Sequence, residues 1–341
     1  MPFDEIKPAG GGDYTSLAAW ETAATGNDAK CFNGGNLGVV ILNNGVSNIS
    51  IYADTASKHN GKADGGDYAR IDPITNTVGI ESQENEITID GLYFHLTGSC
   101  SSTTGGVENG GGIQEQVVKN CVFECDATGA ALKQLWGKFD SGVTTAGNRF
   151  VNNYGVFQSG SISTGSLLRG FVTGANTGST STYDEYSHNT LVDNSGNGDN
   201  GIRDDAEDVM SEFHNNAVLG FTTPYSNVAT FTNASKNAST GASTPGTDPI
   251  NSLTAADQIE DLEDDPTPKA TGSLVGVGTD RTSQADVATD IIGTSRPASA
   301  IDVGCYQISA AVAAGISRLL QGAIYSPVLA ITNSPTKTRR K

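Results

Sequence analysis

Residues 90–95 read DGLYFH, and the same pattern returns as KNCVFE at 119–124, AGNRFV at 146–151, SHNTLV at 187–192 and NNAVL at 215–219. One aligned position always holds a large apolar residue: Phe94, Phe123, Phe150, Leu191 or Val218. Successive members of this series lie 27 to 41 residues apart, which is a period interrupted by insertions. Such a period is typical of a solenoid, in which each coil stacks on the previous one and extends a continuous core.

Short apolar or alternating runs precede the repeat, each bounded by Gly, Asn or Asp: Leu37–Leu42, Ile49–Tyr52, Tyr68–Ile71, Val78–Ile80 and Ile87–Ile89. The chain contains 42 Gly and only 7% aromatic residues, which suits short strands between many turns. No helix of ordinary length intervenes, so the parallel pairing expected here is that of stacked coils. The sequence therefore predicts an all-β solenoid. A β-sandwich is the alternative, but sandwiches alternate without preserving a period.

One short helix is expected near the N-terminus. Ser16 is suited to be a helix N-cap, and Leu17, Trp20 and Ala23 follow at helical spacing. We predict that this amphipathic helix, within residues 1–24, covers the open end of the strand stack, because an uncovered end exposes unpaired backbone groups.

Asparagines recur at one position of the repeat. Asn148, Asn189 and Asn216 each stand two residues before the aligned apolar residue. Stacked amides can hydrogen-bond from coil to coil, as they do in cross-β assemblies. We therefore predict a structural ladder of these three residues at a corner of the solenoid.

The repeats resemble the right-handed parallel β-helix superfamily that includes pectate lyases and phage tailspikes. A second resemblance covers TGSLVGVG at 271–278, DIIGTSRP at 290–297 and IDVGCY at 301–306, which are similar to the closing motif of the choice-of-anchor Q family. The chain departs from that motif at Cys305, where the family has Ala, and at Gln307, where it has Glu. The resemblance implies a single-stranded right-handed parallel β-helix over residues 25–308, and it implies no particular chemistry.

Two residues of the closing motif are expected to be structural. The guanidinium of Arg296 can donate to carbonyl groups of the last coil, because it presents several donors in a fixed fork. The carboxylate of Asp302 can accept backbone N–H groups at the final turn. We interpret both as end-cap residues.

An acidic stretch that runs from Asp193 to Glu212 offers the best candidate for surface chemistry. A polysaccharide lyase site needs carboxylates that hold a cation and a basic group that abstracts a proton. The candidate catalytic residues are Arg203, Asp204 and Asp205. The candidate calcium ligands are Asp199, Asp204, Asp205 and Asp208. The simpler interpretation is a solvated acidic loop, because clustered like charges usually face water.

Other chemistry has weaker signals. The chain has five Cys and four His, with no Cys-x-x-Cys pair and no zinc-ligand spacing, so the cysteines are interpreted as small buried apolar residues. Trp136 with Lys133 and Lys138 could form a platform on which a sugar stacks.

The formal charge of −18, from 38 acidic and 20 basic residues, argues against a nucleic-acid partner. Residues 1–30 contain no apolar stretch that would form the core of a Sec signal peptide. Residues 309–341 combine small apolar pieces with a basic end, and we predict a docking tail; a membrane span over 310–331 is the alternative.

Two classes of function follow. The first is a structural or adhesive protein of a virion or extracellular surface, such as a capsid decoration, tail fibre or spike. It would self-associate, as a trimer by analogy with β-helical spikes, and bind assembly partners through the tail. The second is an exported carbohydrate-active enzyme, a lyase or hydrolase, or a sugar-binding module for acidic polysaccharide, because one fold supports many functions.

Overall fold

The computed structural model describes residues 2–23, 25–45, 47–109, 115–129, 132–138, 148–159, 168–173, 184–204, 210–226 and 231–308. Within these ranges the chain has one α-helix, α1 (Leu17–Ala23), two 3-10 turns, η1 (Ala255–Asp257) and η2 (Ala285–Val287), and strands in three sheets. The predicted tail, residues 309–341, lies outside the described residues.

Sheet A contains β1 (Phe3–Ile6), β2 (Asp28–Cys31), β4 (Ile49–Ala53), β7 (Ile87–Asp90), β10 (Gln116–Lys119), β13 (Asn148–Val151), β16 (Asp184–Ser187), β19 (Met210–His214) and β22 (Phe231–Ser235). Sheet B contains β5 (Arg70–Ile71), β8 (Tyr93–Leu96), β11 (Val122–Cys125), β14 (Tyr154–Phe157), β17 (Thr190–Asp193), β20 (Ala217–Leu219) and β23 (Ala238–Ser239). Sheet C contains β3 (Val40–Leu42), β6 (Val78–Ser82), β9 (Thr104–Asn109), β12 (Lys133–Lys138), β15 (Leu168–Thr173), β18 (Asn200–Asp204) and β21 (Thr223–Ser226).

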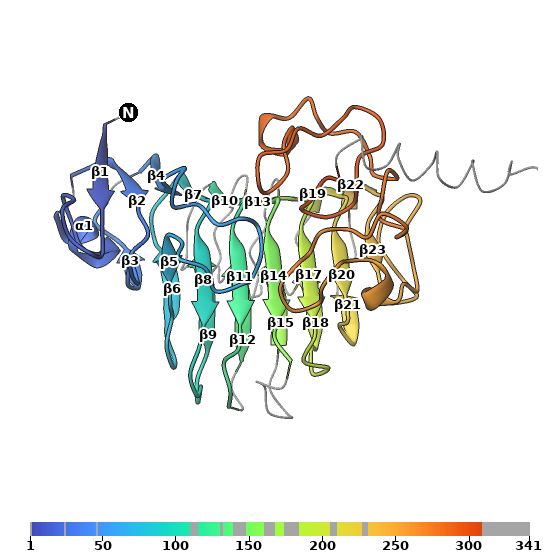
Figure 1. Cartoon of the computed structure of the whole chain (residues 1–341), viewed down its shortest axis with the longest axis horizontal. Helices are drawn as coiled ribbons and strands as arrows, with labels where there is room; N and C mark the ends of the chain where they lie inside the picture. Colours follow the sequence, from blue (N-terminus) through green and yellow to red (C-terminus); the bar gives the residue numbers. More distant parts are fainter. Residues whose placement is uncertain are drawn as a thin grey trace, which may run out of the picture. The chain divides into compact units, whose positions relative to one another are not determined.

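From β4 onward the chain visits sheets A, B and C in turn, and each strand pairs in parallel with the strand one coil earlier (Figure 1). Val118, for example, is the register partner of Ile89 in the coil before and of Phe150 in the coil after. The prediction of an all-β fold with parallel strands is confirmed, and the strand order is consistent with a parallel β-solenoid.

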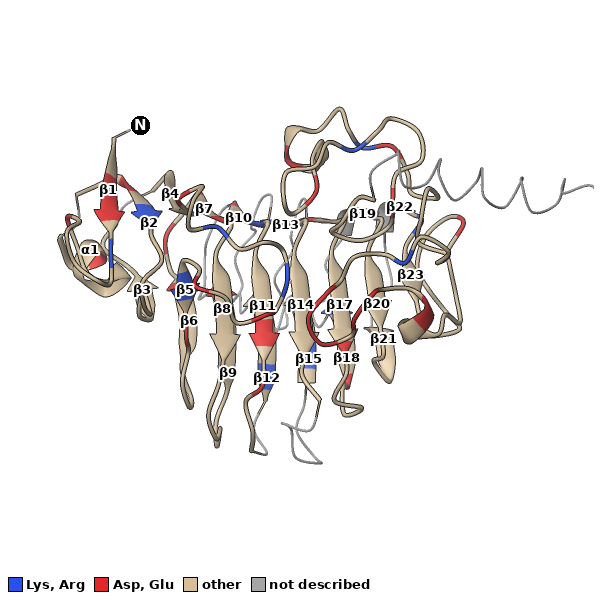
Figure 2. Ribbon diagram, viewed as in Figure 1, with Lys and Arg blue, Asp and Glu red and all other residues tan. Residues whose placement is uncertain are grey.

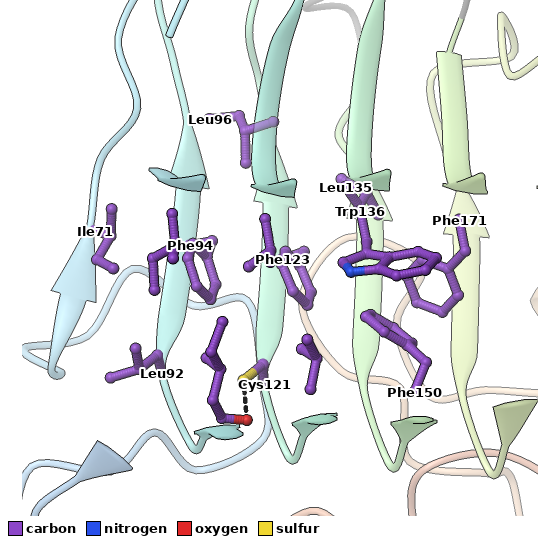
Figure 3. Close-up of a cluster of buried hydrophobic side chains, with 14 of the residues drawn as sticks. Ile71, Leu92, Phe94, Leu96, Cys121, Phe123, Leu135, Trp136, Phe150 and Phe171 are labelled. Atoms are coloured by element: carbon purple, nitrogen blue, oxygen red, sulfur yellow. Dashed lines mark hydrogen bonds between the residues drawn. The ribbon is translucent and has the colours of Figure 1, made fainter. Parts of the chain in front are cut away.

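An aromatic stack fills the interior between the three sheets (Figure 3). The rings of Phe94 and Phe123 lie parallel with centroids 4.8 Å apart, and Phe123 contacts Phe150 at 6.0 Å. Trp136 packs against Phe150 at 5.3 Å. These rings come from sheets A, B and C, so their burial holds the three sheets around one core.

The alignment of one repeat was wrong. Phe123 is the register partner of Gly155, and Gly155 in turn pairs with Leu191. Phe150 lies instead in β13 of sheet A. A Cβ on Gly155 would lie 2.4 Å from Cδ1 of Leu135 and 2.7 Å from Cδ2 of Leu191, so a side chain at this position would require both leucines to shift. Because Gly155 occupies the position that is apolar in neighbouring coils, the pattern of large residues does not give the register of this coil.

The asparagine ladder contains Asn189 and Asn216 but not Asn148. Asn153, Asn189, Asn216 and Asn237 each donate from Nδ2 to a carbonyl of the neighbouring coil, at 2.8 to 2.9 Å. Each amide also contacts the next one, and Nδ2 of Asn153 lies 3.1 Å from Oδ1 of Asn189. Asn148 lies in β13, where its Oδ1 accepts from the backbone N–H of Gln116.

The predicted helix is present as α1. Oγ of Ser16 accepts from the backbone N–H of Ala19 at 3.2 Å, and Leu17 and Trp20 are buried in the interior cluster. The helix lies beside β3 at the end of the row of strands that begins the chain (Figure 1). The strand β1, which pairs with β2, was not predicted because Asp4 and Glu5 obscure its alternation.

Most of residues 251–308 lie along the outer face of sheet B, while residues 281–286 reach strands of sheet A (Figure 1). This location corrects the expectation that the closing motif covers the last coil. The backbone N–H of Cys305 donates to Oγ1 of Thr190 at 3.0 Å, and the hydroxyl of Tyr154 donates to the carbonyl of Glu263 at 3.3 Å. Sheet B is therefore buried on both faces, by the interior on one side and by the C-terminal segment on the other.

Candidate functional site

The predicted acidic stretch is only partly described, because residues 205–209 lie outside the described ranges. Asp199 directly precedes β18, and Arg203, which is half-buried, lies within it. Asp204 ends β18, but its side chain is not described, and Asp205 and Asp208 fall in the undescribed 205–209. Of the candidate catalytic and calcium-binding residues, the structure therefore describes Asp199, Arg203 and the backbone of Asp204.

The first and last acidic residues of this stretch, Asp193 and Glu212, make structural contacts. Oδ2 of Asp193 accepts from the backbone N–H of Gly198 at 2.7 Å, and the same side chain accepts from Ser195. Glu212 lies 2.7 Å from Nε2 of His214 and 2.7 Å from the guanidinium of Arg281. Both carboxylates therefore hold loops and the C-terminal segment in place.

An outward-facing acidic pair lies on sheet C. Glu81 in β6 is the register partner of Glu108 in β9 and, on its other side, of Ile41 in β3. Burial and the neighbouring charge of Glu81 raise the pKa of Glu108 to about 7. Nε2 of Gln83 donates to Glu81 at 2.8 Å. The two carboxyl groups thus differ in environment although they are neighbours.

A groove of about 650 Å³ adjoins this pair, between α1 and sheet C, and we call it the α1–β6 groove. It is lined by Ala18, Glu21, Thr22, Val39, Val40, Ile41, Asn43, Asn44, Asn76, Thr77, Val78 and Glu81. Its volume is in the range of ligand sites, which combine an apolar lining with a few polar groups. Val39 is 39% exposed and Ile41 is 49% exposed, so the apolar part of the lining is open to solvent.

The wall of the groove is fixed by Glu21, whose side chain is buried. Its Oε1 accepts from the backbone N–H groups of Asn43 and Asn44 at 2.9 and 3.0 Å. Glu21 therefore joins α1 to the end of β3 and places a carboxylate at the groove. No Lys or Arg is among the lining residues, so the charge of this surface is negative.

A second polar cluster lies on the outer face of sheet B. Nε2 of His95 lies 3.2 Å from Asp126 and 3.7 Å from Glu124, and the hydroxyl of Tyr93 donates to Glu124. Burial lowers the pKa of His95, but the hydrogen bond to Asp126 and the charge of Glu124 outweigh it and raise the pKa. The raised pKa favours the protonated imidazolium, so this cluster is better suited to an ion pair than to a general base.

Arg296 and Asp302 accept or donate hydrogen bonds within the C-terminal segment, and Arg296 also reaches the coil of β13 and β14 instead of the last coil. The buried guanidinium of Arg296 donates to the carbonyl of Gly304 at 3.0 Å and to Oδ1 of Asn152 at 3.1 Å. Asp302 accepts from the backbone N–H groups of Gly276 and Ile308 at 2.7 and 2.6 Å. They fasten the C-terminal segment to itself and to the loop between β13 and β14.

The proposed sugar platform is wrong as a surface feature. Trp136 is 1% exposed and packs in the interior, and Nζ of the buried Lys133 donates to the carbonyl of Gly129 at 2.6 Å. The Lys138 side chain is not described. The five cysteines are free and buried, and burial raises the pKa of Cys121 and of Cys125 to about 12.

Within the described ranges, no group of three His, Cys, Asp or Glu residues is arranged to hold a metal ion. In the same ranges, no helix is long and apolar enough to cross a membrane. A comparison with known protein families found no matching family model, and a comparison with curated proteins found no matching sequence. The resemblances in the repeats and in residues 271–306 therefore stand on those residues alone.

Proposed function

We propose that this chain is a structural or adhesive component of a virion or other extracellular surface, with a fold of the single-stranded right-handed β-helix type. The observation that carries the proposal is the covering of sheet B by residues 251–308. A sheet buried on both faces yields a stiff body, and stiffness suits a surface element that bears load or presents a binding face.

Ion pairs fasten the cover. Asp286 lies 2.9 Å from Nζ of Lys119 and also contacts the guanidinium of Arg149, so one carboxylate joins the cover to β10 and β13. Arg281 joins the same segment to Glu212 in β19. Contacts spread over several coils resist peeling better than a contact at one end, which supports a mechanical role.

Self-association through residues 309–341 belongs to this proposal. That segment has five basic residues and no acidic one, which leaves 15 basic and 38 acidic residues, a charge of −23, on residues 1–308. Acidic residues are widely spread over the described ribbon, while basic ones are fewer (Figure 2). A basic segment can offset the repulsion between such bodies. A trimer is the arrangement that the resemblance to β-helical spikes suggests.

The test is the composition of particles from the native source. Quantitative mass spectrometry and negative-stain imaging should find the chain at a fixed copy number in phage or filament particles. A chain that occurs only as a free monomer in that source would contradict the proposal.

A second candidate function is action on polysaccharide, and Glu108 is the observation that favours it. A carboxyl group with a pKa of about 7 beside a second carboxylate is the pattern of a general acid and its partner in glycosidases. As register partners on neighbouring parallel strands, Glu81 and Glu108 leave the sheet side by side on the same face.

The two functions are separated by activity on a panel of neutral and acidic polysaccharides, with and without calcium. A hydrolase that uses the pair should lose activity in Glu108→Gln, and a lyase that uses the acidic stretch should lose it in Arg203→Ala or Asp204→Ala. Each variant must retain the circular dichroism and urea midpoint of a folded chain. No turnover by the parent chain on any substrate would leave the structural proposal in place.

A further inference from the structure

We propose that the α1–β6 groove of one copy receives the basic tail, residues 309–341, of a second copy. The inference rests on the proposed function and names the surface through which the copies associate.

The groove requires an occupant that is apolar in part. Val39 and Ile41 are 39% and 49% exposed, and they border the open groove together with the half-buried Val78. Exposed apolar side chains that gather in one concave surface usually mark an interaction site. A segment with small apolar residues can cover them and remove their surface from water.

The groove also requires an occupant that carries positive charge. Glu81 lies in its lining, and Glu108 extends the acidic line by one coil along the outer face of sheet C. Among the described residues that line the groove none is basic, so the groove itself provides no cation for Glu81. A partner that brings Lys or Arg would supply the complementary charge.

Residues 309–341 have both properties in the right order. Apolar residues occur throughout 310–331, and the basic residues Lys337, Arg339, Arg340 and Lys341 follow them. Apolar residues in the groove would leave the basic residues free to reach the carboxylates on sheet C. The five positive charges also explain how bodies of charge −23 could associate at all.

The test is photo-crosslinking in the full-length chain. An equimolar mixture of ¹⁵N-labelled and unlabelled protein would carry a benzophenone amino acid in place of Ile41, with a matched sample substituted at Val277, which is exposed on the C-terminal segment. Mass spectrometry should find crosslinks from position 41 to residues 309–341 in pairs of mixed isotope content. Position 277 should not give these pairs.

A charge reversal provides the second readout. Glu81→Lys should lower the yield of mixed pairs by about tenfold, since it replaces an attraction by a repulsion. Glu260→Lys makes the same change at an exposed site away from the groove and should leave the yield unchanged. Crosslinks from position 41 in pairs of a single isotope only, without any mixed pairs, would show that residues 309–341 bind their own copy and would overturn the proposal.

The possible results distinguish failure of the groove assignment from failure of the proposed structural role. An oligomer, or a fixed copy number in particles, without crosslinks from position 41 would overturn the groove assignment alone. A monomer at every concentration, together with absence from particles, would overturn both the groove and the structural role.

Discussion

Nδ2 of Asn189 donates to Oδ1 of Asn216 at 3.0 Å and, at 2.8 Å, to the carbonyl of Phe150. Oδ1 of Asn189 accepts in turn from the backbone N–H of Asn153 at 3.0 Å. One fully buried side chain thus connects three successive coils. In a solenoid each coil contacts only its neighbours, so a side chain that bonds to both neighbouring coils stabilises their stacking.

Asn189→Ala should lower the free energy of unfolding by about 2 to 4 kcal/mol, because it leaves several buried polar groups without partners. Urea denaturation followed by circular dichroism measures the change. Asn251→Ala, at an exposed position, should change stability by less than about 0.5 kcal/mol. Equal stability of the two variants would show that the ladder contributes little.

Asp286→Asn should loosen the attachment of the C-terminal segment to sheet A, because Asp286 contacts Lys119 in β10 and Arg149 in β13. Burial raises the pKa of Asp286, but Lys119 and Arg149 outweigh this and lower it. A carboxylate with a depressed pKa stabilises the folded state above its unfolded pKa near 3.8, and this contribution is lost as the pH falls below that value. Hydrogen exchange should accelerate around residues 281–296 in the variant at pH 7, whereas the exposed control Asp257→Asn should match the parent. Unchanged hydrogen exchange in residues 281–296 would show that the contacts of Asp286 with Lys119 and Arg149 do not hold this segment in place.

Glu108→Gln should stabilise the chain at alkaline pH. Burial and the charge of Glu81 raise the pKa of Glu108 from 4.5 to about 7, so the folded state prefers the protonated group. The stability contributed by this group is complete below pH 4.5 and is lost as the pH rises through 7. With allowance for solvent screening, the variant should gain about 1 kcal/mol over the parent at pH 8 and little at pH 4. Glu260→Gln serves as the control, and a pH-independent difference would contradict the assignment.

The five thiols should be inert in the folded chain. All five cysteines are buried, and burial raises the pKa of Cys121, Cys125 and Cys305 to about 12, which suppresses the reactive thiolate. A chromogenic disulfide reagent at pH 8 should titrate none of them in native buffer and all five in denaturant. Rapid modification of any one under native conditions would place that cysteine at the surface.

The sequence by itself determined the class of fold and the short helix. Short strands of apolar residues between Gly and Asn recur with a long period, and stacked coils satisfy both patterns because each coil buries the face of its neighbour. The helix was readable because Ser16, Leu17 and Trp20 are local signals. The contact between Asn189 and Asn216 could be predicted because both residues occupy the same position of the repeat.

The tertiary structure alone decided where the remaining features lie. Gly155 occupies the position in sheet B where neighbouring coils have Phe123 and Leu191, so the apolar pattern of the sequence does not reveal this coil. Phe150 fills the interior from sheet A instead. The closing motif lies along sheet B because its apolar residues Leu274, Ile291 and Val303 pack against apolar residues of that sheet that come much earlier in the chain. The groove and the Glu81–Glu108 pair likewise depend on register between strands of different coils. Contacts between distant residues arise from stacking, so no local pattern in the sequence records them.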